Sequence, residues 1–358
     1  MRVGLTFLPT VGPSEEPAQD YYASCLQVCE TADALGFSHV RAVEHYFHEW
    51  GGYSPDPVLF LGAVAARTRR VRLVTGAVVP AFQHPVKLAA SLSMLDNLSG
   101  GRLDAGFGRA FLPSEFEAFG IPMSQSRARM QEGVAAVERL WREDSFRWDG
   151  AFHRFGPLPR LLPVPVQRPG PPVFVAATVS PDSFRWAGER GYHLMVIPVV
   201  ARHERLVELL GIHRAAWEEA GHPGTARLHV SYQCYVAEDA TEARQRAEEH
   251  FEHYRTKQLA AYAAWRGVTS EQYPGYEQME AAARDTRFAD LLAAGTAIAG
   301  DVDEVTEALR QVAKLYPDAE ASLHIRYGDI GHEEALRSVT LLGSQVLPRL
   351  GSANPDPS

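Results

Sequence analysis

Short apolar stretches alternate with longer helical stretches along this chain from its first residues, and this alternation constrains the fold more than any other feature. Several helical stretches begin with proline or end at glycine, residues typical of helix starts and ends. Strands that alternate with helices predict a parallel sheet. Eight such units favour a closed (β/α)8 TIM barrel over an open doubly wound sheet. The expected strands are residues 3–8, 39–43, 72–79, 103–106, 173–177, 193–197, 228–236 and 321–326.

The composition excludes several classes of protein. The chain has 358 residues and 46% hydrophobic content, enough to bury a large core. Its 35 basic and 44 acidic residues give a net charge of −9 without a basic run, so no nucleic-acid partner is expected. Its apolar stretches are too short to cross a bilayer and its start does not resemble a signal peptide, so no membrane association is expected. Three cysteines are too few for a disulfide framework, which favours a reducing, cytoplasmic location.

Two segments interrupt the alternation. Residues 145–171 contain an Asp-Gly turn at 149–150 between aromatic residues, which predicts a hairpin, followed by a proline-rich crossover. Residues 251–295 are charged, aromatic and helical only in parts. We expect residues 1–350 to form one barrel domain with these two insertions, followed by a disordered tail at 351–358.

The second expected strand ends on an unusual pair, Glu44 and His45. Active sites of such barrels lie where strands end, and an imidazole exchanges protons near neutral pH. Both residues are therefore candidates for catalysis, although Glu44 could instead orient a neighbouring arginine. His84, after the third strand, is a further candidate, or it simply begins a helix. His48 and Glu49 add possible metal ligands, but their spacing is not that of a helical HExxH motif, and we predict no metal.

Other strand ends predict an anion site. Arg109 follows the fourth strand, whereas Ser180 and Ser183 begin the helix after the fifth. Amides at a helix start, two hydroxyls and a guanidinium together suit a phosphate. An ordinary helix cap would show the same serines. Gly76, inside the third strand, indicates a bulge or the close approach of a ligand.

A series of motifs in order resembles the bacterial luciferase family of flavin-dependent monooxygenases, and the luciferase α-subunit in particular. The motifs are EH at the second strand end, TGA, QHPVK, LDNLSGGR, GFGRAF, EFEAFG, PPVFVAATVSPDSFRWA, AGDVDEV and LLGSQVLPRL. The resemblance covers about residues 1–350 and is strongest over 36–130. It implies a TIM barrel that receives reduced FMN from a separate flavin reductase. The flavin then reacts with O2, and the resulting C4a-hydroperoxide oxygenates a substrate.

The resemblance also implies roles for single residues. His45 matches a catalytic, proton-transferring histidine, and His84 matches a second, less important one. Val179 would offer its backbone amide to the flavin phosphate. Gly76 and Ala77 match a turn beneath the flavin ring, where the family carries a non-proline cis peptide. The residues assigned to cofactor binding are Gly76, Ala77, Arg109, Phe111, Val179, Ser180 and Ser183.

The chain departs from luciferase around the substrate pocket. Tyr46 and Gly108 replace a histidine and a cysteine, and Leu112 and Val199 replace a tyrosine and a tryptophan. The two apolar replacements favour a hydrophobic substrate, such as an aldehyde or a natural-product intermediate. The segment 251–295 falls where luciferase has a long mobile loop, which predicts a lid or, alternatively, a static insertion.

Two other functions remain open: hydride transfer with a deazaflavin (F420), as in the same superfamily, and non-catalytic flavin binding. The retention of His45, Arg109 and Ser180 favours an FMN-dependent enzyme. The helices expected at 55–68 and 85–98 are unusually apolar. Since the family pairs through this side, we expect a homodimer, although simple burial would produce the same pattern.

Overall fold

Eight parallel strands close into a barrel in the computed structural model, which describes residues 1–351. Going round the barrel, the order is β1, β2, β3, β4, β7, β8, β9 and β11, and β11 pairs with β1. The predicted TIM barrel is therefore confirmed. The strands are β1 Arg2–Phe7, β2 His39–Ala42, β3 Arg72–Thr75, β4 Leu103–Phe107, β7 Val173–Ala176, β8 His193–Val196, β9 Leu228–Val236 and β11 Glu320–His324.

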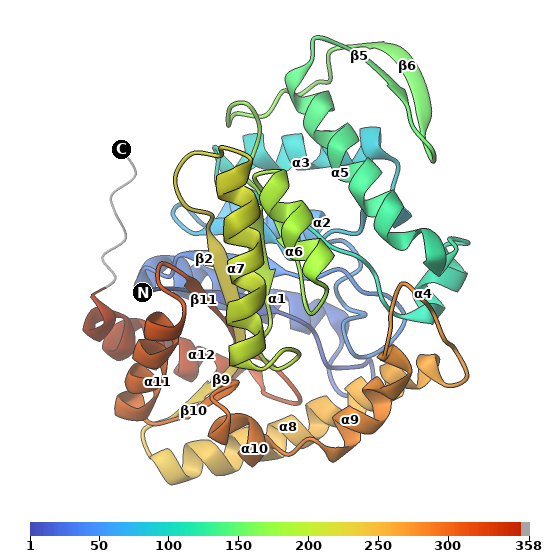
Figure 1. Cartoon of the computed structure of the whole chain (residues 1–358). Helices are drawn as coiled ribbons and strands as arrows, with labels where there is room; N and C mark the ends of the chain where they lie inside the picture. Colours follow the sequence, from blue (N-terminus) through green and yellow to red (C-terminus); the bar gives the residue numbers. More distant parts are fainter. Residues whose placement is uncertain (352–358) are drawn as a thin grey trace.

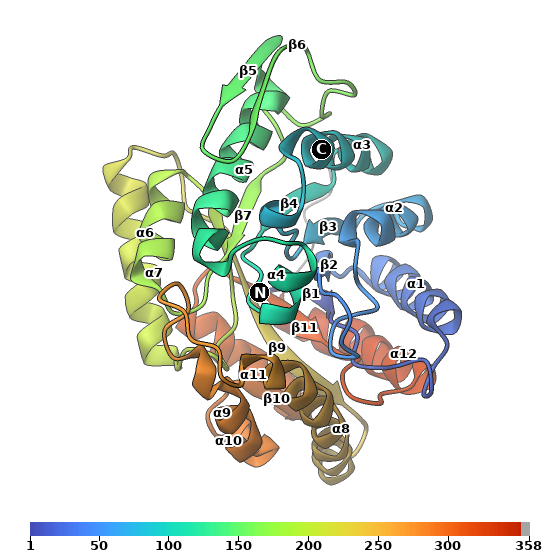
Figure 2. The ribbon, with the colours of Figure 1, turned by 90° about the vertical axis from the view of Figure 1, so that its right-hand side faces the viewer.

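Helices surround the strands, and a short helix, α4, lies in front of them in the view of Figure 2. Figure 1 shows α8, α9 and α10 along one side of the molecule and the β5–β6 hairpin at the opposite side. Within residues 1–351, no helix is both long enough and apolar enough to cross a membrane. The helices are α1 Ala18–Leu35, α2 Pro57–Arg67, α3 Pro85–Ser99, α4 Pro113–Ala118, α5 Ser126–Arg142, α6 Pro181–Glu189, α7 His203–Glu219, α8 Ala240–Tyr262, α9 Met279–Asp285, α10 Phe288–Ala293, α11 Val302–Leu315 and α12 His332–Leu341.

Local sequence accounts for several of the helix ends. The Asp56 side chain accepts a hydrogen bond from the Leu59 amide at 3.0 Å and caps α2, which begins with a proline. Gly36 and Gly100 end α1 and α3 in the left-handed conformation, which glycine adopts without steric cost.

The insertions are more regular than the sequence predicted. Residues 145–171 contain the expected hairpin, formed by β5 Ser145–Asp149 and antiparallel β6 Arg154–Pro159. Part of 251–295 continues α8, and the rest forms short helices. A strand that the sequence analysis did not predict, β10 Ala297–Gly300, pairs with the carboxyl end of β9. From Ser352 onward, the tail expected to be disordered lies outside the described residues.

Charged side chains fill the amino-terminal end of the barrel. Asp104 is fully buried and accepts hydrogen bonds from Arg72 and from Arg227, the latter at 2.9 Å. Burial would raise the pKa of Asp104, but the two guanidinium groups outweigh it and hold the pKa well below its usual range. Glu320 pairs with Arg2 at 2.8 Å and with Arg227 at 3.1 Å. This end of the barrel is therefore closed by mutually compensated charges.

Candidate active site

His45 lies just beyond β2 and is held by a buried carboxylate from α4. Its Nδ1 is 3.0 Å from Glu115 Oε1, and the Tyr46 amide donates to the same oxygen at 3.0 Å. The Glu115 side chain is only 1% exposed, whereas the His45 side chain is 13% exposed. An ionised carboxylate only accepts hydrogen bonds, so His45 donates from Nδ1 and its Nε2 faces away with a free lone pair. The imidazole is thus oriented for proton exchange at Nε2.

Aromatic rings surround His45. The Trp50 ring lies 4.9 Å and the Phe111 ring 5.8 Å from the imidazole, between centroids. Phe111 also contacts Tyr262 and Tyr276 from the segment 251–295, each at 6.0 Å. The catalytic histidine of the sequence prediction therefore faces a largely apolar, aromatic wall.

Glu44 has other partners than His45. Its carboxyl group accepts hydrogen bonds from the Val79 amide at 2.9 Å, from the Tyr46 hydroxyl at 2.8 Å and from the Gln83 amide at 3.4 Å. Burial outweighs these hydrogen bonds and raises the pKa of Glu44 to about 8. The alternative that Glu44 orients an arginine is wrong, because its partners are a tyrosine, a glutamine and a main-chain amide. It ties the end of β2 to the chain that follows β3.

The chain that leaves β3 contains the cis peptide bond expected from the resemblance, between Gly76 and Ala77. A Cβ at Gly76 would lie 2.2 Å from Cγ and Cδ of Arg41, so only glycine fits over that side chain. Similarly, a Cβ at Gly108 would lie 2.9 Å from the Cβ of Ala77. Close packing of the chain around the cis bond therefore explains both glycines.

Most of the residues predicted to hold an anion lie near the starts of α5 and α6. Arg127 donates to Ser183 Oγ at 3.0 Å and to Ser180 Oγ at 3.2 Å. Ser180 precedes α6 but makes no side-chain capping bond, which argues against the simple helix cap. Arg109 instead donates to Ser126 Oγ at 2.9 Å and to the Gln272 carbonyl at 3.0 Å.

The residue that contacts both serines, Arg127, was missed by the sequence analysis. It is the second residue of a regular helix, and no local pattern distinguishes it from the other arginines of α5. Burial, and then the positive charge of Arg109, lower the pKa of Arg127. Two like charges held together at the start of two helices favour a bound anion.

Two further residues of the predicted site lie at its margins. Val179, directly before Ser180, is 40% exposed. His84 precedes α3 and accepts a hydrogen bond from the Val86 amide at 3.3 Å. Its ring packs on His153 and Phe155 of the hairpin region rather than on His45.

The segment 251–295 packs over the loop that carries Arg109 and Phe111. Tyr273 donates a hydrogen bond to the Ala110 carbonyl, and the Arg109 guanidinium lies 4.4 Å from the centre of the Tyr273 ring. Trp265 belongs to the same buried cluster. The segment therefore covers this side of the mouth.

Leu112 does not line a substrate pocket, contrary to the sequence expectation. It is fully buried against Trp50, Ala261 and Tyr262, because the end of α8 packs directly on it. Val199, by contrast, is 49% exposed just beyond β8.

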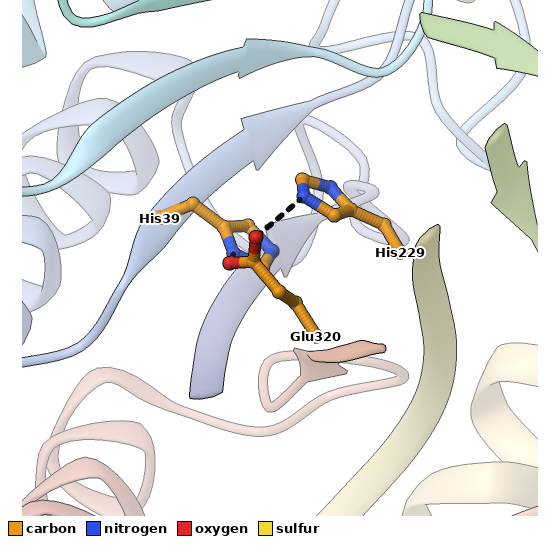
Figure 3. Close-up of side chains that lie close together, drawn as sticks. All are labelled: His39, His229 and Glu320. Carbon is orange, nitrogen blue, oxygen red and sulfur yellow. Dashed lines mark ion pairs between the residues drawn. The ribbon is translucent and has the colours of Figure 1, made fainter. Parts of the chain in front are cut away.

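Within residues 1–351, the side chains of His39, His229 and Glu320 lie close together at the amino-terminal end of the barrel (Figure 3). These residue types could hold a metal ion. The two imidazoles are stacked, 4.3 Å apart between centroids and inclined by only 11°. Ring nitrogens direct their lone pairs in the ring plane, so two nearly parallel rings do not aim at one point. Glu320 is already paired with Arg2 and Arg227. The geometry favours a structural role, and the absence of a metal stays a prediction.

Comparison with known proteins gives a consistent assignment. The family model described as luciferase-like monooxygenase matches residues 1–319. A crystal structure of the monooxygenase RslO1 from Streptomyces bottropensis has a TM-score of 0.85 and 45% sequence identity, covering 97% of this chain and 99% of that one.

Two named relatives are also similar. The oxygenase component of a flavin-dependent trigonelline monooxygenase from Acinetobacter baylyi is 31% identical over 66% of this chain and 65% of its own length, so the chain spans less than two thirds of it. A 4-hydroxyprotoasukamycin monooxygenase from Streptomyces nodosus subsp. asukaensis is 29% identical over 97% of this chain and 92% of its own length. As its sequence predicted, the chain belongs to the luciferase-like monooxygenase family and is an enzyme of that class.

Proposed function

We propose that this protein is the oxygenase component of a two-component monooxygenase, which takes reduced FMN from a separate flavin reductase and uses O2 to oxygenate a hydrophobic small molecule. The proposal rests on Arg109 and Arg127, which donate hydrogen bonds to serine hydroxyls at the barrel mouth. No carboxylate among residues 1–351 lies within 4.0 Å of either guanidinium. The Acinetobacter relative is named as the oxygenase component of a flavin-dependent enzyme, which supports an oxygenase that works with a separate reductase.

The residues at the mouth fit a flavin phosphate. Arg127 would hold the phosphate together with Ser180 and Ser183, which it already contacts, and Arg109 would add a second positive charge. The Arg41 side chain packs on one side of Gly76, and because glycine has no side chain of its own, the flavin ring could approach this backbone closely. When bound, reduced FMN would supply the electrons that activate O2.

His45 would hold or transfer one proton at Nε2. Its Nδ1 proton is bonded to the buried Glu115 carboxylate, which selects the tautomer with an accepting Nε2 and stabilises the imidazolium once it forms. A positioned acid or base contributes about 10²–10⁴-fold to such reactions. His84, in contact with the hairpin region, would have the lesser role that the resemblance implied.

The substrate would be apolar. Trp50 and Phe111 form a wall beside His45, and Ile197 and Val199 expose apolar surface beyond β8. These groups suit an aldehyde or a natural-product intermediate with aromatic or alkyl surface. The segment 251–295 would act as a lid that excludes water from the reacting groups.

The direct test supplies enzymatically reduced FMN and O2 with a panel of apolar candidates and follows product masses. A product heavier by one oxygen atom, labelled from ¹⁸O2, is the expected result. If reduced deazaflavin supports turnover without O2 uptake, the enzyme is a hydride-transfer catalyst instead. If reduced FMN binds but no candidate is converted, while O2 consumption stays at the rate of free flavin, a non-catalytic binding protein is favoured.

The expected homodimer is part of the proposal. Leu59 of α2 and Met94 and Leu98 of α3 expose large apolar side chains on neighbouring helices. Pairing two copies through this side would cover them. Replacing Leu59 and Leu98 with glutamate should convert a dimer to a monomer in light-scattering measurements, whereas an unchanged mass would exclude this face.

A further inference from the structure

Within residues 1–351, Arg41 carries a buried positive charge without a counter-ion. It projects from β2 into the barrel and is only 4% exposed. Its Nη2 donates to Ser231 Oγ at 2.5 Å, and its Nε has no hydrogen-bond partner. No carboxylate of the described residues lies within 4.0 Å of its guanidinium.

Arg326, the other buried arginine of the described residues, and the partly buried Arg227 are both compensated. Arg227 pairs with Asp104 and Glu320, and the Arg326 guanidinium pairs with Glu16 at 2.7 Å. Burial lowers the pKa of Arg41 to about 10, so the group still carries its charge at neutral pH. An isolated buried charge is costly, and such groups are normally paired in proteins. Something outside this chain is therefore expected to compensate Arg41.

The position of Arg41 indicates where that compensation comes from. Its Cγ and Cδ lie directly beneath Gly76, where a Cβ would approach them to 2.2 Å and Nε to 2.9 Å. Gly76 begins the cis peptide at the carboxyl end of β3, the side of the barrel that the proposed function gives to the flavin ring. The Arg41 side chain therefore packs directly against the backbone at this end of the barrel.

The neighbouring groups provide no negative charge either. His324 is fully buried on β11, and burial lowers its pKa to about 4, so it is neutral at pH 7. Gln233 follows Ser231 by two residues on β9, on the same face of the strand, and its side-chain nitrogen is also buried without a partner. Arg41 and Gln233 therefore provide two unpaired hydrogen-bond donors in this part of the barrel. An electron-rich acceptor would pair with them.

We propose that Arg41 compensates the negative charge of the reduced isoalloxazine ring and makes the protein bind reduced FMN in preference to oxidised FMN. The inference rests on the proposed function. The ring of oxidised FMN is neutral, whereas the reduced ring loses a proton near neutral pH and becomes an anion. A cation close to the ring stabilises the reduced form and raises the reduction potential of bound flavin.

The test measures dissociation constants for oxidised FMN in air and for reduced FMN under argon, at pH 8. It compares the full-length wild type with Arg41→Met and Arg41→Lys. The wild type should prefer reduced FMN by about tenfold or more. Arg41→Met should abolish most of that preference, mainly by weakening the reduced complex, and Arg41→Lys should retain part of it. In addition, Arg41→Met should melt at a higher temperature than the wild type without flavin, because an uncompensated buried charge is removed.

The outcomes separate the two proposals. If the wild type binds neither form of FMN, the proposed function fails. If FMN binds but the ratio of the two dissociation constants is the same in all three proteins, the role of Arg41 is refuted and the proposed function stands. If Arg41→Met does not fold, the neutral and polar variant Arg41→Gln decides: an unchanged ratio contradicts the proposal, and a reduced ratio supports it.

Discussion

The two ends of the barrel differ in how their charged side chains are paired. At the amino-terminal end, Asp104 and Glu320 are each held by two arginines, with Arg227 shared between them. At the mouth, the partners to which Arg41 and Arg127 donate within the described part of the chain are serine hydroxyls. The first arrangement is complete within the chain, and the second is not.

This difference separates stability from function. Breaking a closed ion-pair network exposes a buried charge and destabilises the fold. Removing an arginine that awaits a ligand removes binding energy instead, and can leave the empty protein as stable as before. Arginine variants at the two ends distinguish these two cases.

The largest effect is expected at His45. His45→Ala should slow substrate oxidation by about 10²–10⁴-fold while reduced FMN binds as before, because the change removes a proton carrier and leaves the phosphate contacts intact. Single-turnover kinetics and an anaerobic titration measure the two quantities. His84→Ala is the matched control, with a smaller loss expected. Turnover that is unchanged in His45→Ala would remove this residue from the mechanism.

At the amino-terminal end, Arg227→Met should reduce the free energy of unfolding by about 3–5 kcal/mol, because Asp104 and Glu320 lose a shared partner. Denaturant unfolding measures this change. Arg139→Met, which removes an exposed pair with Glu143, should change it by about 1 kcal/mol or less. A comparable loss in both variants would show that burial of the network does not matter.

At the mouth, Arg127→Met should weaken reduced-FMN binding by about 10–100-fold and change the stability of the flavin-free protein little. An anaerobic titration and a melting curve give both values. Arg129→Met, two residues along the same helix, is the control and should bind FMN normally. If Arg127→Met loses stability as Arg227→Met does, the contrast between the two ends is wrong.

The smallest effect is a pH dependence at Glu44. Its pKa in the folded protein is raised to about 8, above the ordinary value, so the folded state holds this proton more tightly than the unfolded state. The resulting stabilisation is complete at acidic pH and is lost as pH rises through 8. Glu44→Gln, which mimics the protonated side chain, should therefore gain melting temperature relative to the wild type between pH 6 and pH 9. A difference that is constant with pH would show that Glu44 is ionised throughout.

The comparison also shows which parts of the site were predictable. His45, Gly76, Arg109 and Ser180 could be proposed from the sequence because each lies within or just after an expected strand, or begins a helix, in a short motif. Glu115 lies in the EFEAFG motif, but the motif does not indicate that Glu115 pairs with His45, which lies 70 residues earlier. Leu112 was misassigned for the same reason, since the side chains that bury it come from the distant end of α8.

The sequence by itself determined the alternation of strands and helices, the helix caps and the order of the family motifs, because these depend on local spacing and backbone preference. Only the tertiary structure decided which charges are compensated. Arg41, Arg127 and Arg227 are the same residue type, yet their partners lie 190, 53 and 123 residues away along the chain. Closing the barrel brings those partners together, and the short-range interactions between charged groups and hydroxyls exist only after that closure.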